Sequence, residues 1–207
     1  MTMVATDGHR LAYVDNSVGN GEDVKPFRAL VPRKAMGEIV KLSAEAPDEG
    51  KVVIAGDDNH LFFRVGDRLL ITRKLTGNFP DYERVLPQGA THQALLSRDE
   101  ARAAIERVAQ FADERSRSIR VQFAAGEMRV YSSSVETEES EESVPADYSG
   151  PEMEIGFNAQ YLLEFLRAVP QAQVSFELKD QKSAGEMRPA GDSLPDQYRY
   201  VVMPMRI

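Results

Sequence analysis

The chain repeats one pattern of predicted elements three times, and this repeat constrains its fold more than any other feature. Each copy begins with a short apolar strand, continues into a helix with one apolar face, and ends in strands that alternate apolar and polar residues. The copies start near Phe27, His92 and Met153, so the period is about 60 residues, longer than in ordinary solenoid repeats. Two such units side by side make an α+β domain, with helices on one face of antiparallel sheets.

Capping residues and apolar faces locate the three helices. Helices are predicted over residues 33–46, 98–111 and 159–169. Pro32 precedes the first helix, and proline is tolerated where a helix begins. Ser97 and Asn158 can cap the second and third helices with their side-chain oxygens, and Glu100 completes a capping box with Ser97. The predicted apolar face of the first helix comprises Met36, Ile39, Val40 and Leu42.

Turn residues separate the predicted strands. The strands are predicted over residues 2–6, 10–15, 27–31, 52–55, 61–65, 69–75, 92–96, 119–124, 128–133, 138–144, 153–157, 174–178, 186–187 and 200–203. Pro80 and Pro87 bar regular structure at the ends of an irregular linker. The expected organisation is a partial domain over 1–82 and a complete domain over 83–207. Because the first hairpin ends as a complete copy ends, we also expect a cut chain, with a β-α-β piece missing before Met1.

The composition excludes several classes of function. The 207 residues contain no cysteine and only three histidines, so disulfides and thiolate metal sites are excluded and a histidine metal site is disfavoured. The net charge of −8 argues against tight sequence-specific DNA binding but leaves room for a local basic surface. No apolar run approaches the length of a membrane span, and no signal peptide opens the chain. We therefore expect a cytoplasmic protein that has no membrane partner, cofactor or metal.

The last eight residues form an unusually apolar chain terminus. Residues 200–203 are rich in β-branched and aromatic residues and predict a strand, and Pro204 ends its pairing because proline has no N–H to donate. Two interpretations stay open. The last residues dock inward as the end of a core strand, or Met203, Pro204 and Met205 line a hydrophobic groove for another protein, since methionine surfaces adapt to many partners.

Asp7 and His9 in the first turn invite an acid–base interpretation, because histidine titrates near neutral pH. No nucleophile, metal cluster or glycine-rich phosphate loop accompanies them, so catalysis is disfavoured. The acidic run over 136–142 is interpreted as a strand and loop that face water rather than as a metal site. The residues therefore give no support to an enzyme.

Five motifs of the sequence resemble one family. They read Val-Ala-Thr-Asp-Gly-His-Arg-Leu-Ala at 4–12, Val-Pro-Arg-Lys at 31–34, Gly-Asn-Phe-Pro-Asp-Tyr at 77–82, Met-Glu-Ile-Gly-Phe-Asn at 153–158 and Tyr-Val-Val-Met-Pro-Met-Arg at 200–206. In this order they resemble the β subunit of bacterial DNA polymerase III, the sliding clamp family. The resemblance covers the whole chain and corresponds to the latter part of the second of three family domains and to the whole of the third.

The resemblance implies an α+β DNA-clamp fold of repeated β-α-β-β-β units, with antiparallel sheets outside and helices on the inner face. In the family, two chains form a homodimeric ring around double-stranded DNA without reading its sequence. The ring makes the polymerase processive and has no catalytic activity. The implied partners are the α subunit of DNA polymerase III, the clamp loader, other polymerases and mismatch-repair proteins. We do not expect this chain to close a ring in the usual way, because the first family domain has no counterpart in it.

The resemblance also implies a groove for partner peptides. In the family, partner proteins insert a short linear motif of the Gln-Leu-x-Leu-Phe kind between the second and third domains. The matching positions are Thr6, Gly8, His9, Arg10, Leu11, Pro80, Arg84, Val85, Asn158, Tyr161, Val201, Val202, Met203, Pro204, Met205 and Arg206. Lys182 departs from the small or apolar lining usual at its position, so we expect it to narrow or recharge that edge. Ile207 replaces a common leucine, which is a mild change.

A DNA-facing set and a ring contact are implied as well. The basic residues that match positions facing the hole are Arg33, Lys34, Arg117 and Arg120. Phe111 matches a ring-interface position and is expected to be exposed in a monomeric or weakly associated chain. Two hypotheses stay open at this point: a clamp fragment that keeps the groove and loses ring closure, or a stand-alone regulatory module that competes for clamp partners without encircling DNA.

Overall fold

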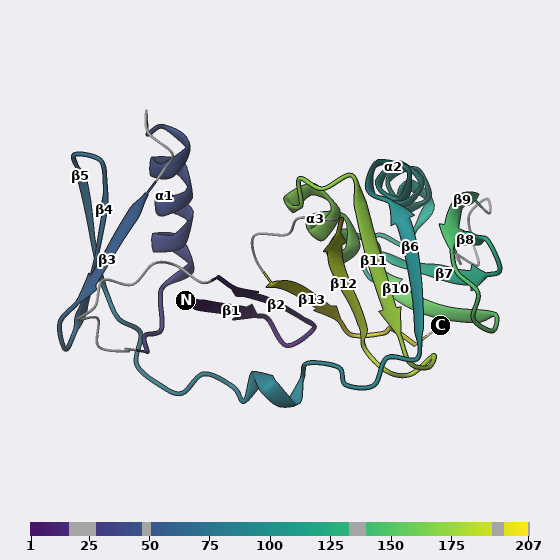
Figure 1. The fold of residues 1–207 in the computed structure, drawn as a ribbon, viewed down its shortest axis with the longest axis horizontal. Coiled ribbons are helices and arrows are strands. Elements are labelled where there is room, and N and C mark those ends of the chain that lie inside the picture. Colours follow the sequence, from purple (N-terminus) through teal and green to yellow (C-terminus); the bar gives the residue numbers. More distant parts are fainter. Residues whose placement is uncertain (17–27, 47–50, 133–139, 192–196, 207) are drawn as a thin grey trace. The chain divides into compact units, whose positions relative to one another are not determined.

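The computed structural model describes residues 1–16, 28–46, 51–132, 140–191 and 197–206. The chain divides into two compact units, a large one that comprises Met1–Gly19 and Asp81–Ile207 and a small one that comprises Asn20–Pro80. Figure 1 labels the elements of both. Among the described helices, none has the length and apolar character needed to cross a membrane.

Ten antiparallel strands form the sheet of the large unit, and the order of the strands across it is not their order in the chain. From one edge to the other they are β1 (Thr2–Thr6), β2 (Arg10–Asp15), β13 (Gln197–Val202), β12 (Gly185–Ala190), β11 (Gln173–Leu178), β6 (His92–Ser97), β9 (Glu141–Asp147), β8 (Glu127–Ser132), β7 (Ser118–Ala124) and β10 (Met153–Asn158). The first hairpin thus pairs, through β2, with β13, the last strand of the chain (Figure 1).

The helices of the large unit begin at the predicted caps. In α2 (Arg98–Val108) the Ser97 hydroxyl accepts a hydrogen bond from the Glu100 N–H at 3.5 Å, and in α3 (Ala159–Ala168) the Asn158 side chain caps the first turn. The predicted end of α2 is a separate 3₁₀ turn, η2 (Ala109–Phe111). A second 3₁₀ turn, η1 (Tyr82–Arg84), lies in the linker. The predicted order of one strand, one helix and three strands is confirmed in both copies of this unit.

The core of the large unit fills the space between the helices and one face of the sheet. Strand β7 alternates strictly, so that Ile119, Val121 and Phe123 are fully buried while the residues between them are partly exposed. Phe176 packs on both Phe123 and Phe157, with ring centroids 5.3 and 5.5 Å apart. The helices α2 and α3 add alanine, leucine and phenylalanine side chains to the same cluster. The sheet therefore has one covered apolar face and one polar face.

The described residues of the small unit form one helix and a three-stranded sheet. Its elements are α1 (Arg33–Ala44), β3 (Val52–Gly56), β4 (His60–Val65) and β5 (Arg68–Arg73). Ile39 of α1 packs on Leu61 and Phe63 of β4. The predicted apolar face is wrong at Val40, which is 65% exposed, because the buried side of α1 follows Ala35 and Ile39.

Several predicted strands differ from the structure in their bounds or pairing; β13, predicted over 200–203, begins at Gln197 and ends before Met203. The described part of the strand predicted over 27–31 forms a single bridge, Leu30 to Leu75, and Pro32 has no N–H with which to continue the pairing; residue 27 lies outside the described residues. The strand predicted over 138–144 is β9, from Glu141 to Asp147, and residues 133–139 lie outside the described residues. Strand β12 extends through Pro189, which is possible because its pairing with β13 stops at Met187.

Candidate functional site

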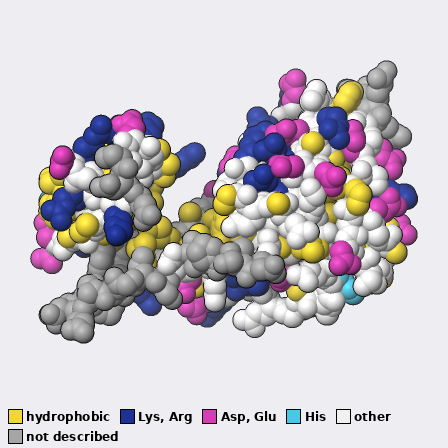
Figure 2. Space-filling view, turned by 45° about the horizontal axis from the view of Figure 1, so that its top comes forward, with side chains coloured by type: hydrophobic (Ala, Val, Ile, Leu, Met, Phe, Trp, Pro, Cys, Tyr) yellow, Lys and Arg dark blue, Asp and Glu magenta, His cyan; other side chains and the backbone are white. Residues whose placement is uncertain are grey.

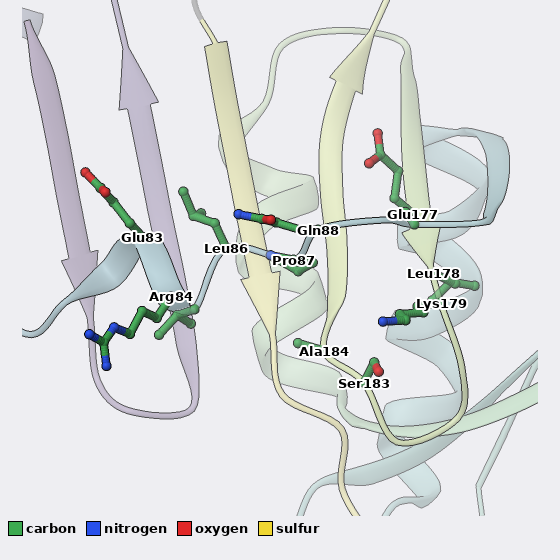
Figure 3. Close-up of a pocket in the computed structure, with 12 residues that line it drawn as sticks. Glu83, Arg84, Leu86, Pro87, Gln88, Glu177, Leu178, Lys179, Ser183 and Ala184 are labelled. Carbon is green, nitrogen blue, oxygen red and sulfur yellow. The ribbon is translucent and has the colours of Figure 1, made fainter.

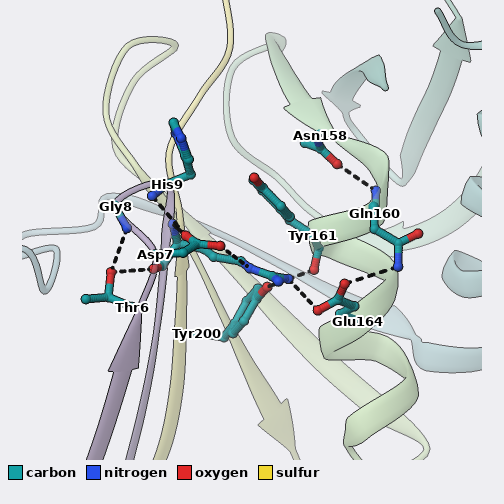
Figure 4. Close-up of polar contacts among 10 residues, drawn as sticks. Thr6, Asp7, Gly8, His9, Asn158, Gln160, Tyr161, Glu164 and Tyr200 are labelled. Atoms are coloured by element: carbon teal, nitrogen blue, oxygen red, sulfur yellow. Dashed lines mark hydrogen bonds and ion pairs between the residues drawn. The ribbon is translucent and has the colours of Figure 1, made fainter. Parts of the chain in front are cut away.

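The turn between β1 and β2 is held by its own side chains. Gly8 has φ 87°, a left-handed conformation that glycine adopts without strain. The Thr6 hydroxyl donates to the Arg10 carbonyl at 2.7 Å and accepts from the Gly8 N–H at 3.2 Å. Asp7 accepts from the His9 N–H at 3.0 Å and from the Arg10 N–H at 3.1 Å. The turn, whose residues 6–9 are labelled in Figure 4, is thus a hydrogen-bonded unit.

The Asp7 carboxyl is unsuited to act as a proton acceptor. Burial alone would raise the pKa of Asp7, but the hydrogen bonds from His9 and Arg10 outweigh it and hold the pKa below its usual value. The described residues contain no cluster of metal-ligating side chains either.

Arg10 connects the hairpin to α3. Its guanidinium donates to the Tyr200 hydroxyl at 3.0 Å, forms an ion pair with Glu164 at 2.7 Å, and lies 4.4 Å above the Tyr161 ring (Figure 4). A second ion pair joins it to Asp7 at 3.1 Å. Burial alone would lower the pKa of Arg10, but the hydrogen bonds with Tyr200 and Glu164 outweigh it and raise the pKa, so the side chain stays charged.

The chain terminus runs beside this turn. The Met203 N–H donates to the His9 carbonyl at 2.9 Å, and the Met205 N–H donates to the Gly156 carbonyl at 2.8 Å. Met203 is 43% exposed, Pro204 and Met205 are partly exposed, and Arg206 is exposed. The tail therefore presents apolar side chains to solvent from a backbone that is fixed at two points, as a surface for binding requires.

Three of the predicted groove residues lie underneath this surface. Leu11, Val201 and Val202 are buried, with Val201 opposite Leu11 and Val202 opposite Arg10 in the pairing of β2 with β13. Their side chains support the surface from below. Tyr200, Val201 and Val202 are thus part of the core, whereas the residues from Met203 to Arg206 are partly or fully exposed, and their role in a groove stays a prediction.

The start of α3 forms the opposite side. The Asn158 amide oxygen accepts from the Gln160 N–H at 2.9 Å, and the amide nitrogen donates to the Ser116 carbonyl at 3.2 Å (Figure 4). The Tyr161 ring is stacked on the His9 ring, with centroids 6.4 Å apart and planes inclined by 23°. Tyr161 thus contacts the hairpin through His9 and Arg10, and the role of Asn158 and Tyr161 in a groove stays a prediction.

The linker borders a hollow of about 370 Å³ in the large unit. Its lining includes Arg84 and Val85 from the linker and Lys179, Ser183 and Ala184 from the turn between β11 and β12 (Figure 3). Lys182, expected to narrow this edge, is exposed and does not belong to the lining. Arg84 is paired with Asp81 at 2.7 Å. Pro80 is the last residue of the small unit, so its place in the groove stays a prediction.

The predicted DNA-facing residues lie at different kinds of position. Arg33 and Lys34 are exposed at the start of α1 in the small unit, and Arg117 is exposed just before β7. Arg120 lies on the polar face of β7, opposite the face covered by α2 and α3, and forms an ion pair with Glu154 at 2.9 Å. Figure 2 shows basic and acidic side chains interspersed on one face of the molecule. Contact with DNA stays a prediction for all four.

Phe111, the predicted ring-interface residue, lies in η2 and is 40% exposed. Its role at an interface between chains stays a prediction.

Two residues that complete the site were missed in the sequence. Glu164 and Tyr200 contact Arg10 but are not among the predicted groove residues, although Tyr200 is the first residue of the motif at 200–206. The spacing of Tyr161 and Glu164, three residues apart, places both on one helix face and is the only local signal for Glu164. Tyr200 gave no such signal, because its hydroxyl comes close to Arg10 only when β2 pairs with β13 in the folded protein.

Solved structures with the same fold are DNA polymerase sliding clamps, and this is the class to which the protein belongs. A sliding clamp from Pseudomonas aeruginosa superposes with a TM-score of 0.89 at 36% identity, over 99% of this chain and 55% of that one. Another structure of the clamp from this organism, bound to griselimycin, gives a TM-score of 0.86 at 36% identity, over 99% of this chain and 54% of that one.

The chain belongs to the DNA polymerase III beta subunit family. Residues 1–81 match the model of the central domain, and residues 83–206 match the model of the C-terminal domain. The beta sliding clamp of Pseudomonas putida is 38% identical over 204 residues, which are 99% of this chain and 54% of the relative. The chain thus spans about half the length of the curated relatives it matches.

Proposed function

We propose that this chain acts in a sliding clamp, a non-catalytic processivity factor for DNA polymerase, and that its part is to receive partner proteins through short linear peptides. The observation that carries this proposal is the surface formed by Met203, Met205, His9, Arg10 and Tyr161. It combines exposed apolar side chains with a few fixed polar groups, as binding sites for peptides do. The proposed partners are the polymerase α subunit, the clamp loader, other polymerases and mismatch-repair proteins, all in the cytoplasm.

The surface is contained in the large unit. The hairpin, the start of α3 and the tail, which build it, all belong to Met1–Gly19 and Asp81–Ile207. Backbone hydrogen bonds of β2 with β13, and of Met203 with His9, connect these segments directly. We therefore propose that peptide recognition does not depend on a closed ring around DNA.

A peptide with the sequence Gln-Leu-x-Leu-Phe should bind the 207-residue chain with a dissociation constant on the order of micromolar, measured by isothermal titration calorimetry. Met203→Glu should weaken binding about tenfold or more, because it puts a charge where a leucine or phenylalanine of the peptide would lie. Met203 follows β13 and is partly exposed, so this variant should stay folded.

The matched control for this titration is Met3→Glu. Met3 is exposed in β1 to a similar degree and is not a groove residue. The proposal would be overturned if the wild-type protein, shown to be folded by its circular dichroism spectrum, gave no heat of peptide binding. Equal loss of affinity in both variants would place the peptide elsewhere.

Encirclement of duplex DNA is proposed for the assembled clamp. The acidic net charge of −8 gives little general attraction to phosphates, so a clamp of this kind would be held on DNA by topology. We expect the 207-residue chain alone to sediment as a monomer or weak dimer. In gel filtration it should separate from nicked circular DNA rather than elute with it. Retention on circular DNA that is lost when the DNA is linearised would contradict this expectation.

A further inference from the structure

We infer that Glu164 of α3 is a positioning residue for the peptide surface: it holds the Arg10 guanidinium over the Tyr161 ring and so fixes the hairpin turn against α3 before a partner arrives. This inference rests on the proposed peptide-binding function. Glu164 is outside the positions that match the family groove, and it acts through Arg10 rather than by contact with the peptide.

The Glu164 carboxylate is oriented from within its own helix. One oxygen accepts from the Gln160 side-chain amide at 3.1 Å, and the other forms the ion pair with Arg10 at 2.7 Å (Figure 4). Gln160 precedes Glu164 by one helical turn, so the two side chains are neighbours on the helix surface. A carboxylate with one oxygen anchored in this way presents the other in a fixed direction.

Arg10 receives directional contacts from both sides. Its Nε–H donates to Asp7 in the hairpin turn at 3.1 Å, and its Nη1 meets Tyr200 and Glu164. The guanidinium is planar and rigid, so contacts at its two ends fix its plane. That plane lies over Tyr161, where a cation is attracted to the ring face. The turn, β13 and α3 are thereby joined at one side chain.

The joined elements are those that form the proposed peptide surface. His9, next to Arg10, stacks on Tyr161, and its carbonyl accepts from the Met203 N–H. Displacement of Arg10 would therefore move the turn relative to both α3 and the tail. A site that is fixed before binding gains affinity because less conformational freedom is lost in the complex.

Glu164→Gln tests the inference in the full chain. Glutamine keeps the length and the contact with Gln160 but removes the charge that holds Arg10. The affinity for the Gln-Leu-x-Leu-Phe peptide should fall about threefold to fivefold, the range expected when a partly exposed ion pair is lost. The matched control is Glu106→Gln, which removes the ion pair of α2 with Arg167 at 2.8 Å and touches no groove residue. Its peptide affinity should equal that of the wild type.

A double-mutant cycle separates positioning from a general loss of stability. In an Arg10→Ala background, Glu164→Gln should have no further effect on affinity, because no guanidinium is left for Glu164 to hold. Additive losses would overturn the inference. The NMR signal of the Arg10 Nε–H gives a readout in the free protein, and its exchange with water should be faster in Glu164→Gln than in Glu106→Gln.

The outcomes distinguish this inference from the function on which it rests. Peptide binding by the wild type with unchanged affinity in Glu164→Gln would overturn the inference and leave the proposed function standing. Absence of binding by the wild type would overturn both, even if the Arg10 signal showed that Glu164 anchors the side chain. Weaker binding by Glu164→Gln alone, with faster exchange at Arg10, would support both.

Discussion

Replacing Phe165 with alanine should lower the free energy of unfolding of the large unit by about 3 to 5 kcal/mol, the range for a buried phenylalanine truncated in a well-packed core. Phe165 lies on α3 and is fully buried. Its ring packs against Tyr198 and Tyr200 of β13, with centroid distances of 5.5 and 5.3 Å. The substitution leaves a cavity between α3 and the strand that leads to the tail.

Urea unfolding, monitored by tyrosine fluorescence, measures the stability of the large unit. All seven tyrosines lie in the segments of the large unit, so their signal does not report on the small unit. The control is Phe111→Ala, the same truncation at a side chain that is 40% exposed, which should cost about 1 kcal/mol or less. Similar losses in the two variants would show that α3 is not anchored through Phe165.

Phe165 also links stability to the proposed function. Tyr200, which stacks on Phe165, donates its hydroxyl proton to the Tyr161 carbonyl at 3.0 Å and accepts from Arg10. Truncation of Phe165 therefore loosens the side chain on which both groups depend. Peptide affinity should fall in Phe165→Ala even at urea concentrations at which the protein remains folded, whereas it should not change in Phe111→Ala.

Local signals were sufficient to predict the repeat and its helices. Ser97 and Asn158 cap their helices as their residue types predict, and the copies in the large unit follow the predicted element order. Such signals work because a cap or an apolar face is decided within a few residues of sequence. The motif resemblance added the family, and the family models confirm it.

Long-range pairing explains what could not be predicted. The strand predicted over 186–187 extends through Pro189 in β12, and only the pairing of β12 with its two neighbours shows that the missing N–H is tolerated there. Val40 fits an apolar face by spacing, yet the sheet of the small unit does not reach it. Glu164 forms an ion pair with Arg10, which is far from it in the sequence, and neither residue type predicts the other as its partner. These features depend on the neighbours that the fold supplies.

Glu186→Gln should destabilise the large unit by about 3 kcal/mol, a typical loss when one member of a buried ion pair is removed. Glu186 of β12 is 1% exposed and forms ion pairs with Arg199 of β13 and with Arg188 of its own strand. Glutamine fits the space but leaves two guanidinium groups beside it without their shared counter-charge. Urea unfolding by tyrosine fluorescence gives the measurement.

Glu142→Gln is the control for this loss. Glu142 pairs with Arg107 at 2.6 Å, but both side chains are considerably more exposed than Glu186, so the substitution should cost much less stability than Glu186→Gln. If the two glutamine variants lost equal stability, burial would not be what makes the Glu186 pair matter.

The Glu186 variant should also alter the linker. Arg199 donates from Nη2 to the Pro87 carbonyl at 3.2 Å and from the same nitrogen to the Glu186 carboxylate at 2.7 Å. The buried carboxylate therefore holds the arginine in the position from which it binds the linker. With glutamine at 186, the Val85 and Leu86 amides, which donate to the Tyr82 carbonyl, should exchange faster with solvent. Because Val85 is a predicted groove residue, peptide affinity should fall as well. Unchanged exchange at Val85 and Leu86 would show that η1 holds the linker without help from β13.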